Sequence, residues 1–254
     1  MCRALTALIR EEICPADPRK ALPLAFTNLR LARHVPRVTA RPCLLGSVWA
    51  TLGTVYRVLG KHSKSEKCYR FALRRADRCR CRRCRPDVLR RLTYLRVEQG
   101  RNEEAKRLAD QALAAYRAAG DSLGIGRALL ARSMAEYYLG ETSNAITSAR
   151  AALTLIPAKD TLYYLAGLQG LAWYLGYTEF EDDLKTALEA LDHAWRTARG
   201  RTKPYRMIRI RIRCGTRRGA LPVGQAAPVP SAPGAQRRPP AALRSRASIA
   251  MPPS

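Results

Sequence analysis

Histidine, aromatic residues and acidic residues are all scarce in this chain. The shortage of histidine limits the catalytic sites that the protein can form. Only three of the 254 residues are histidine, and His34, His62 and His193 have no cysteine, serine or carboxylate at a catalytic spacing. No glycine-rich loop carries the Lys and Ser/Thr side chains that hold nucleotide phosphates. The sequence therefore predicts a protein that is not an enzyme.

Long hydrophobic runs are absent as well. No run approaches the roughly 20 residues that a membrane-spanning helix needs. Arg10, Glu11 and Glu12 interrupt the apolar N-terminal segment, which a signal peptide would keep continuous. The eight cysteines have irregular spacings, unlike the disulfide framework of a small secreted domain. We expect a cytoplasmic protein in a reducing compartment, without membrane insertion.

What the chain does contain predicts helices. Alanine and leucine recur throughout, and runs of β-branched residues, which mark strands, are nearly absent before Arg206. With 47% hydrophobic residues, a chain of this length can bury one sizeable core or form a solenoid. We therefore expect an all-α fold.

Positive charge is concentrated in two places. Of the formal net charge of +26, residues 200–254 carry +12, from twelve Lys or Arg and no acid. Residues 67–90 carry about +8, from ten basic residues against Asp77 and Asp87. Such a distribution favours salt-sensitive contact with polyanions such as RNA or DNA.

An internal repeat organises the middle of the chain. Leucine and small residues precede a glycine in each copy, and small or aromatic residues follow it. In the first copy the pattern consists of Trp49, Leu52, Gly53, Tyr56, Gly60, Ser65, Tyr69 and Ala72. This segment resembles the tetratricopeptide repeat (TPR), and the resemblance extends over four units: 46–79, 86–119, 126–159 and 162–199. Arg96, Arg132 and Glu136 depart from the family pattern.

The turn glycines define the spacing of the units. Gly60, Gly100, Gly140 and Gly176 lie 40, 40 and 36 residues apart, against about 34 residues in a TPR unit. The surplus predicts two inserted connectors, 80–85 and 120–125, although the second could instead lengthen the flanking helices. Pro86, after the first connector, suits the start of a helix.

The resemblance implies a bacterial-type α-solenoid of antiparallel helix pairs, wound as a right-handed superhelix. Members of the family hold peptides or protein segments on a concave face lined by the first helix of each unit. The resemblance implies a non-enzymatic scaffold that binds a protein or peptide partner, which could be acidic. Such a scaffold could belong to a regulatory or signalling system. The corresponding groove positions here are Arg57, Arg90, Tyr94, Glu98, Tyr137, Tyr138, Tyr163, Trp173 and Tyr174.

The two ends of the chain differ from the repeats. Residues 1–45 predict N-terminal helices that form a half-repeat. Within them, Asp17 and Pro18 open a helix whose apolar face comprises Ala21, Leu24, Ala25, Leu29 and Ala32. Residues 200–254, rich in Pro, Ala and Arg, predict disorder. That tail is either a genuine polybasic arm or an out-of-frame translation of GC-rich DNA.

The connector between the first two units, "RCRCRRCRP", suggests two kinds of site. Its arginines offer an alternative function in polyanion binding: Arg78, Arg80, Arg82, Arg83 and Arg85. Its cysteines, Cys79, Cys81 and Cys84, could bind zinc if Cys68 or Cys43 supplied a fourth thiolate, although Cys68 is expected to face the core. The alternatives are a redox-sensitive loop and a basic loop without a cofactor, and we expect no other cofactor.

Overall fold

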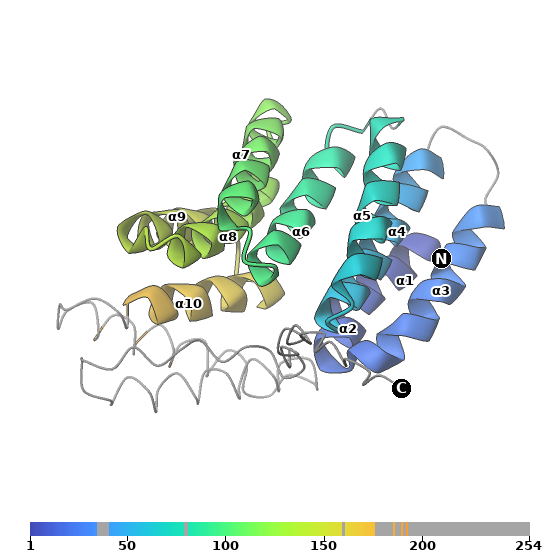
Figure 1. The fold of residues 1–254 in the computed structure, drawn as a ribbon, viewed down its shortest axis with the longest axis horizontal. Helices are drawn as coiled ribbons and strands as arrows, with labels where there is room; N and C mark the ends of the chain where they lie inside the picture. The colour runs from blue at the N-terminus through green and yellow to red at the C-terminus, as the bar shows by residue number, and fades with distance from the viewer. Residues whose placement is uncertain are drawn as a thin grey trace, which may run out of the picture. The chain divides into compact units, whose positions relative to one another are not determined.

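The structure is a computed structural model that describes residues 1–34, 41–78, 81–158, 161–175, 185, 189 and 192. Within these residues all regular secondary structure is helical, which confirms the predicted all-α fold (Figure 1). The predicted tail 200–254 and most of 176–199, in the fourth unit, lie outside the described residues. None of the described helices combines the length and apolar character needed to cross a membrane.

The helices pack in adjacent pairs, as in a solenoid. The pairs are α4 (Arg41–Val58) with α5 (His62–Asp77), α6 (Cys84–Glu98) with α7 (Asn102–Ala118), and α8 (Ser122–Tyr138) with α9 (Thr142–Leu155), while α10 (Thr161–Leu175) packs on α9. The first helices of successive pairs also touch, because α4 contacts α6, α6 contacts α8, and α8 contacts α10. Each pair thus buries the face that it cannot cover alone.

Glycine makes the turn inside each pair. The backbone φ is positive at the three described turn glycines: +71° at Gly60, +74° at Gly100 and +83° at Gly140. In the first turn, the Gly60 N–H donates to the Arg57 carbonyl at 2.9 Å, and the Lys61 N–H donates to the Tyr56 carbonyl at 2.8 Å. These two bonds satisfy helix-end carbonyls in a geometry that only glycine adopts without strain.

The two predicted connectors behave differently from simple insertions. At 120–125, Gly120 turns the chain with φ +63°, and the Asp121 carboxylate accepts a hydrogen bond from the Gly124 N–H at 3.0 Å. Because α8 begins at Ser122, most of this surplus lengthens a helix. The other connector lies two residues earlier than predicted, because α5 ends at Asp77 and α6 begins at Cys84 rather than at Pro86.

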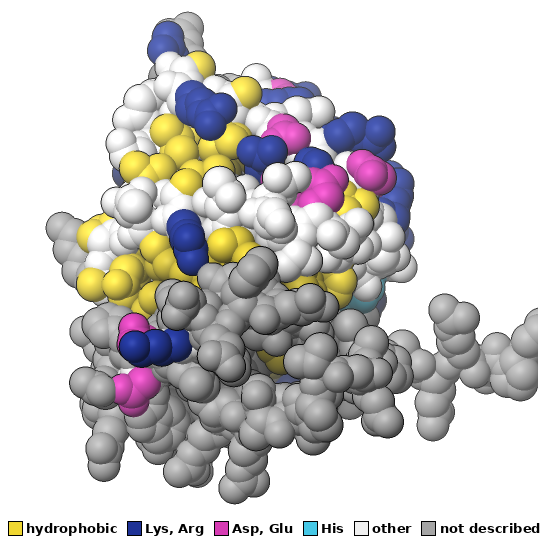
Figure 2. Space-filling model, turned by 90° about the vertical axis from the view of Figure 1, so that its left-hand side faces the viewer, with side chains coloured by type: hydrophobic (Ala, Val, Ile, Leu, Met, Phe, Trp, Pro, Cys, Tyr) yellow, Lys and Arg dark blue, Asp and Glu magenta, His cyan; other side chains and the backbone are white. Residues whose placement is uncertain are grey.

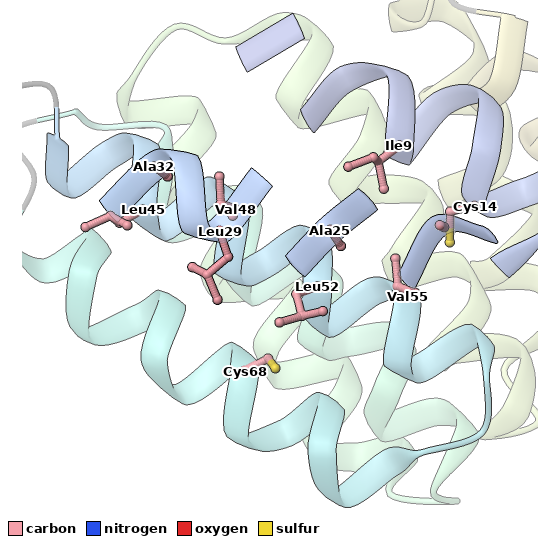
Figure 3. Packing of buried hydrophobic residues seen from close by; sticks show 11 residues of the cluster. Ile9, Cys14, Ala25, Leu29, Ala32, Leu45, Val48, Leu52, Val55 and Cys68 are labelled. Carbon is pink, nitrogen blue, oxygen red and sulfur yellow. The ribbon is translucent and has the colours of Figure 1, made fainter. Parts of the chain in front are cut away.

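The N-terminal region forms further helices, α1 (Cys2–Leu8), a π-helical turn η1 (Ile9–Ile13), α2 (Cys14–Ala16) and α3 (Pro18–His34). The Asp17 carboxylate accepts from the N–H groups of Arg19 and Lys20 at 3.1 and 3.2 Å, so the predicted helix start is present. Helix α3 packs on α4, and α1 and η1 touch α4 as well. Figure 3 shows the resulting cluster, which includes Ile9, Cys14, Ala25, Leu29, Val48, Leu52, Val55 and Cys68.

Small residues bring the helices of the repeats close together. Ala105, Ala109 and Ala112 on α7 are fully buried, as are their equivalents on α9, Ala145, Ala149 and Ala152. At Gly53 on α4 even a methyl group is too large, because a Cβ there would lie 2.8 Å from the Tyr69 ring. The small residues of the repeat pattern are therefore positions of close helix approach.

The charged departures from the TPR pattern are compensated by ion pairs. Arg96, only 8% exposed, donates to Glu66 of α5 at 3.0 Å, to Glu104 of α7 at 2.9 Å and to Gln99 at 2.7 Å. One guanidinium thereby links the two neighbouring units where an apolar side chain was expected.

The second pair of departures, Arg132 and Glu136, lie close enough to pair in charge, although the Arg132 Nε and both Glu136 carboxylate oxygens are buried without a hydrogen bond among the described residues. Glu136 of α8 is fully buried, and the Arg132 Nε lies 3.0 Å from its carboxylate, one helical turn away. The same Nε lies 3.2 Å from Asp110 of α7. Arg132 and Glu136 are thus an internal ion pair that also connects α8 to the preceding unit.

Candidate functional site

The first helices carry a group of arginines and tyrosines that we name the arginine–tyrosine cluster. Its members are Arg57 on α4, Asp87, Arg90, Arg91 and Tyr94 on α6, Arg127 on α8, and Tyr163 on α10. Four of these positions, Arg57, Arg90, Tyr94 and Tyr163, were predicted from the TPR resemblance. The structure adds the other three and connects them through defined contacts.

Asp87 anchors the centre of the cluster. Its carboxylate accepts from the Arg90 Nη2 at 2.8 Å and from the Arg91 Nε at 2.9 Å. The Arg91 Nη1 also donates to Thr54 of α4 at 3.1 Å, so the network crosses from one unit to the preceding one. Burial alone would raise the pKa of Asp87, but the Arg91 and Arg90 charges hold it well below its usual range.

Tyr163 of α10 lies between two guanidinium groups. Arg90 lies 5.3 Å from the centre of the ring and donates to the phenol oxygen at 3.3 Å, while Arg127 lies 4.3 Å from the ring centre. Burial raises the pKa of Tyr163, yet Arg90, Arg91 and Arg10 together lower it below the ordinary value. A phenol responds this way only in a positive potential, which is the dominant electrostatic feature of this face.

Next to α4, the carboxylate of Glu98 pairs with the outermost arginine of the cluster, Arg57. Arg57 forms an ion pair with Glu98 and lies 5.6 Å from the centre of the Tyr94 ring, while the His62 Nε2 lies 3.7 Å from Glu98. Burial alone would lower the pKa of Arg57, and Glu98 raises it above the ordinary value. Four guanidinium groups thus face two carboxylates across the cluster, which leaves it positively charged.

Two donors inside the cluster are not matched. The Nε of Arg90 and the Nη2 of Arg91 are buried and have no hydrogen-bond partner among the described residues. A buried donor without a partner costs about 1–3 kcal/mol, and more when it is charged.

A second aromatic group lies on α8 and α10. The Trp173 Nε1 donates to the Tyr137 hydroxyl at 3.0 Å, and the Tyr137 ring stacks on Tyr174 with centroids 5.0 Å apart. Tyr138 meets Tyr137 edge-on at 5.5 Å and is 41% exposed. Figure 2, which looks from the side where α9 and α10 lie in Figure 1, shows hydrophobic side chains gathered in patches with Lys and Arg between them.

Two predicted groove residues do not offer a contact surface. Arg90 is 2% exposed and Tyr174 is 6% exposed, because they hold α6 to α10 and α8 to α10 through Tyr163, Tyr137 and Ser133. Their prediction as partner-contacting residues was wrong, and they pack the repeats together. The remaining seven predicted residues keep exposed surface: Arg57, Tyr94, Glu98, Tyr137, Tyr138, Tyr163 and Trp173.

The chain's own N-terminal segment approaches the same face, which the sequence did not indicate. Helix α1 and η1 contact α4, and Ile9 is fully buried in the shared core. Arg10 of η1 forms an ion pair with Glu11. Burial lowers the pKa of Arg10, but Tyr163, Glu11 and Asp87 raise it above the ordinary value, so Arg10 adds to the charge beside the cluster.

The arginines of the connector are partly engaged by acids. Arg83 lies 2.9 Å from Asp121, and Arg85 forms an ion pair with Asp77. Arg78 and Arg82 are exposed, and Arg80 lies outside the described residues. Nothing in these contacts arranges the predicted polyanion-binding residues into a groove.

The cysteines divide into two groups. Cys68 is buried at 5% exposure in the apolar cluster of the N-terminal helices and α4, which confirms the expectation that it faces the core, and of the two alternatives for a fourth ligand it is not the one that joins the connector thiols. The sulfurs of Cys43, Cys81 and Cys84 instead lie within 4.8 Å of one another. Burial, followed by the hydrogen bond with Cys81, raises the pKa of Cys84 to about 12. Cys79 lies outside the described residues.

Comparison with known proteins shows the fold only. No family model matches the sequence, and no curated protein matches it. Among solved structures, the crystal structure of BtubC (BKLC) from P. vanneervenii is similar, with a TM-score of 0.53 and 17% sequence identity. The match covers 100% of this chain and 86% of that chain. The likeness supports the helical architecture and leaves the function to be inferred from the residues.

Proposed function

We propose that this chain is a TPR-type scaffold, without enzymatic activity, that binds an acidic segment of a protein partner on the first helices α6, α8 and α10. The observation that carries this proposal is the arginine–tyrosine cluster, in which Arg90 and Arg127 lie over the Tyr163 ring and both Arg127 and Tyr163 keep exposed surface. Arginine and tyrosine are enriched among the residues that dominate protein interfaces. The excess positive charge selects a partner of negative charge.

The second aromatic group favours a partner that also has an apolar residue. Tyr138 is exposed, and Trp173 and Tyr137 are half-buried beside it on α8 and α10. A segment running along α8 and α10 would meet the guanidinium group of Arg127 and the aromatic rings of this second group. An extended acidic peptide with a Phe or Leu side chain fits this order of chemistry.

A matched pair of substitutions tests the proposal. Arg127 lies at the cluster on α8, whereas Arg107 is exposed on α7, a second helix, so Arg127→Ala and Arg107→Ala remove the same charge from different faces. Binding of a fluorescein-labelled peptide rich in Glu and Asp and containing Phe is measured by anisotropy. Loss of one interface contact worth 1–2 kcal/mol weakens binding about 5- to 30-fold. We expect that loss for Arg127→Ala and less than about a twofold change for Arg107→Ala.

Binding of a labelled single-stranded oligonucleotide, measured in the same way, distinguishes peptide binding from the alternative function of polyanion binding. If the oligonucleotide binds more tightly than the peptide, and both substitutions weaken it equally, the exposed charge binds polyanions and the groove proposal is wrong. Thermal unfolding of each variant is recorded in parallel, so that loss of folding is not mistaken for loss of binding.

A further inference from the structure

Cys43, Cys81 and Cys84 meet at one end of the first two helix pairs, one helical turn before Asp87 of the arginine–tyrosine cluster. Cys43 lies in the first turn of α4, Cys84 is the first residue of α6, and Cys81 belongs to the connector between α5 and α6. Their sulfurs lie within 4.8 Å of one another although Cys43 and Cys84 are far apart in the sequence. Packing of α4 against α6 brings these thiols together.

The spacing suits a metal ion. In a tetrahedral zinc site with Zn–S bonds of about 2.3 Å, neighbouring sulfurs are about 3.8 Å apart. Sulfurs that all lie within 4.8 Å reach this arrangement with small side-chain adjustments. Soft thiolates select zinc over magnesium or calcium, which prefer oxygen ligands. We propose that the reduced chain binds one zinc ion through Cys43, Cys81 and Cys84.

Burial disfavours the Cys84 thiolate, and the positive groups around the three thiols would offset part of that cost when a metal ion binds. Zn²⁺ with three thiolates carries a net charge of −1, because each thiol loses its proton when its Zn–S bond forms. Arg3 of α1 lies close enough to Cys84 to act on its thiol, and Arg82, Arg83 and Arg85 flank the ligands in sequence. Cys43 and Cys84 also lie in the first turns of their helices, where the helix dipole favours negative charge. The exposed Cys81 leaves a route for the ion to enter.

Oxidation of Cys43 competes with this binding. In the structure Cys43 is half of a disulfide, and the other described cysteines are thiols, so its partner sulfur is not among the described residues. A dithiol reductant such as dithiothreitol converts this disulfide to two thiols and is itself oxidised to its cyclic disulfide. The zinc-binding form is therefore the reduced one.

The site would connect neighbouring repeats. Cys43 belongs to α4 of the first helix pair and Cys84 to α6 of the second, so zinc would join α4 to α6 at the end where the connector leaves α5. A ligand that binds only the folded chain stabilises it. Chelation of zinc is therefore expected to lower the thermal midpoint of the reduced protein.

The test measures zinc directly. The full chain is expressed with added zinc, purified with dithiothreitol, passed over a desalting column and analysed for metal by mass spectrometry. We expect about one zinc per chain in the unchanged protein, and at least a tenfold loss in Cys81→Ser and in Cys43→Ser. Cys2→Ser, a half-buried cysteine outside the group, is the matched control and should keep its zinc.

A second measurement keeps the proposal falsifiable if a variant folds poorly. Cobalt(II) added to the reduced unchanged chain should give thiolate-to-metal absorption that zinc abolishes. Three results would overturn the proposal: no zinc above the level of a buffer blank, equal zinc in Cys43→Ser and the unchanged chain, or alkylation showing that Cys43 stays in a disulfide under dithiothreitol.

Discussion

Replacing Arg96 by methionine tests whether the ion pairs that interrupt the repeat pattern hold neighbouring units together. Methionine keeps the volume and flexibility of the aliphatic stem but removes hydrogen bonds to Glu66, Glu104 and Gln99 at 3.0, 2.9 and 2.7 Å. The two carboxylates that remain are 27% exposed, so they lose their cation but can still reach water.

The expected cost follows from that partial exposure. Removing one partner of a fully buried pair costs about 3–5 kcal/mol, because the other charge stays buried and unpaired. Since water can hydrate Glu66 and Glu104 in part, we expect about 2–3 kcal/mol, below that range. With a urea dependence of about 2–3 kcal/mol per molar, the midpoint of unfolding should fall by about 1 M.

Circular dichroism at increasing urea concentration measures the shift, with Arg107→Met as the control. Arg107 is exposed on α7, so its replacement should change the unfolding free energy by less than about 0.5 kcal/mol. The triple variant Arg96→Met, Glu66→Gln, Glu104→Gln removes the unpaired charges as well and should recover at least half of the loss. If Arg96→Met shifts the midpoint no more than Arg107→Met, or if the triple variant recovers nothing, the ion pairs do not hold these units together.

Three further predictions concern local geometry and charge. Gly124→Ala should cost about 1–3 kcal/mol of unfolding free energy, because its Cβ would lie 2.3 Å from the Tyr116 ring; urea unfolding measures this. Gly100→Ala, where nothing lies within 4 Å, should cost only about 1–2 kcal/mol, from the left-handed φ of +74°, and Gly100→Asn should cost less. The lowered pKa of Asp87 stabilises the fold above the ordinary pKa of about 3.9, and this stability is lost as the pH falls below that value. Asp87→Asn should therefore flatten the pH dependence of unfolding below about pH 4, and an unchanged slope would contradict the ion-pair geometry.

The features that sequence reasoning could find are those set by local rules. Turn glycines are recognisable because positive φ excludes most other residues, and Gly60, Gly100 and Gly140 adopt it. Fully buried alanines were visible through their helical spacing. Asp17 was predictable because a carboxylate before a proline-initiated helix caps the first turn.

Only the contacts within one helix of the arginine–tyrosine cluster could be predicted from the sequence; its contacts between helices could not. Asp87, Arg90 and Arg91 lie three and four residues apart, so the intrahelical ion pairs could have been read from the sequence. The contacts of Arg90 and Arg127 with Tyr163 depend on how α6, α8 and α10 stack, which the repeat pattern does not specify to within a side chain. The same stacking buries Arg90, so a groove position in the family pattern became an internal contact here.

The meeting of Cys43 with Cys84 depends on where two helices begin. The repeat pattern started the first unit at residue 46, which left Cys43 outside it, and placed Cys84 in a connector. Helix α4 in fact begins at Arg41 and α6 at Cys84, so both cysteines lie in first turns. The first helices of successive units contact each other, and the starts of neighbouring first helices lie at the same end of a stack of such units. Cysteines in the first turns of neighbouring first helices can therefore meet, and shifts of five residues in the predicted start of α4 and two in that of α6 were enough to hide the thiol cluster.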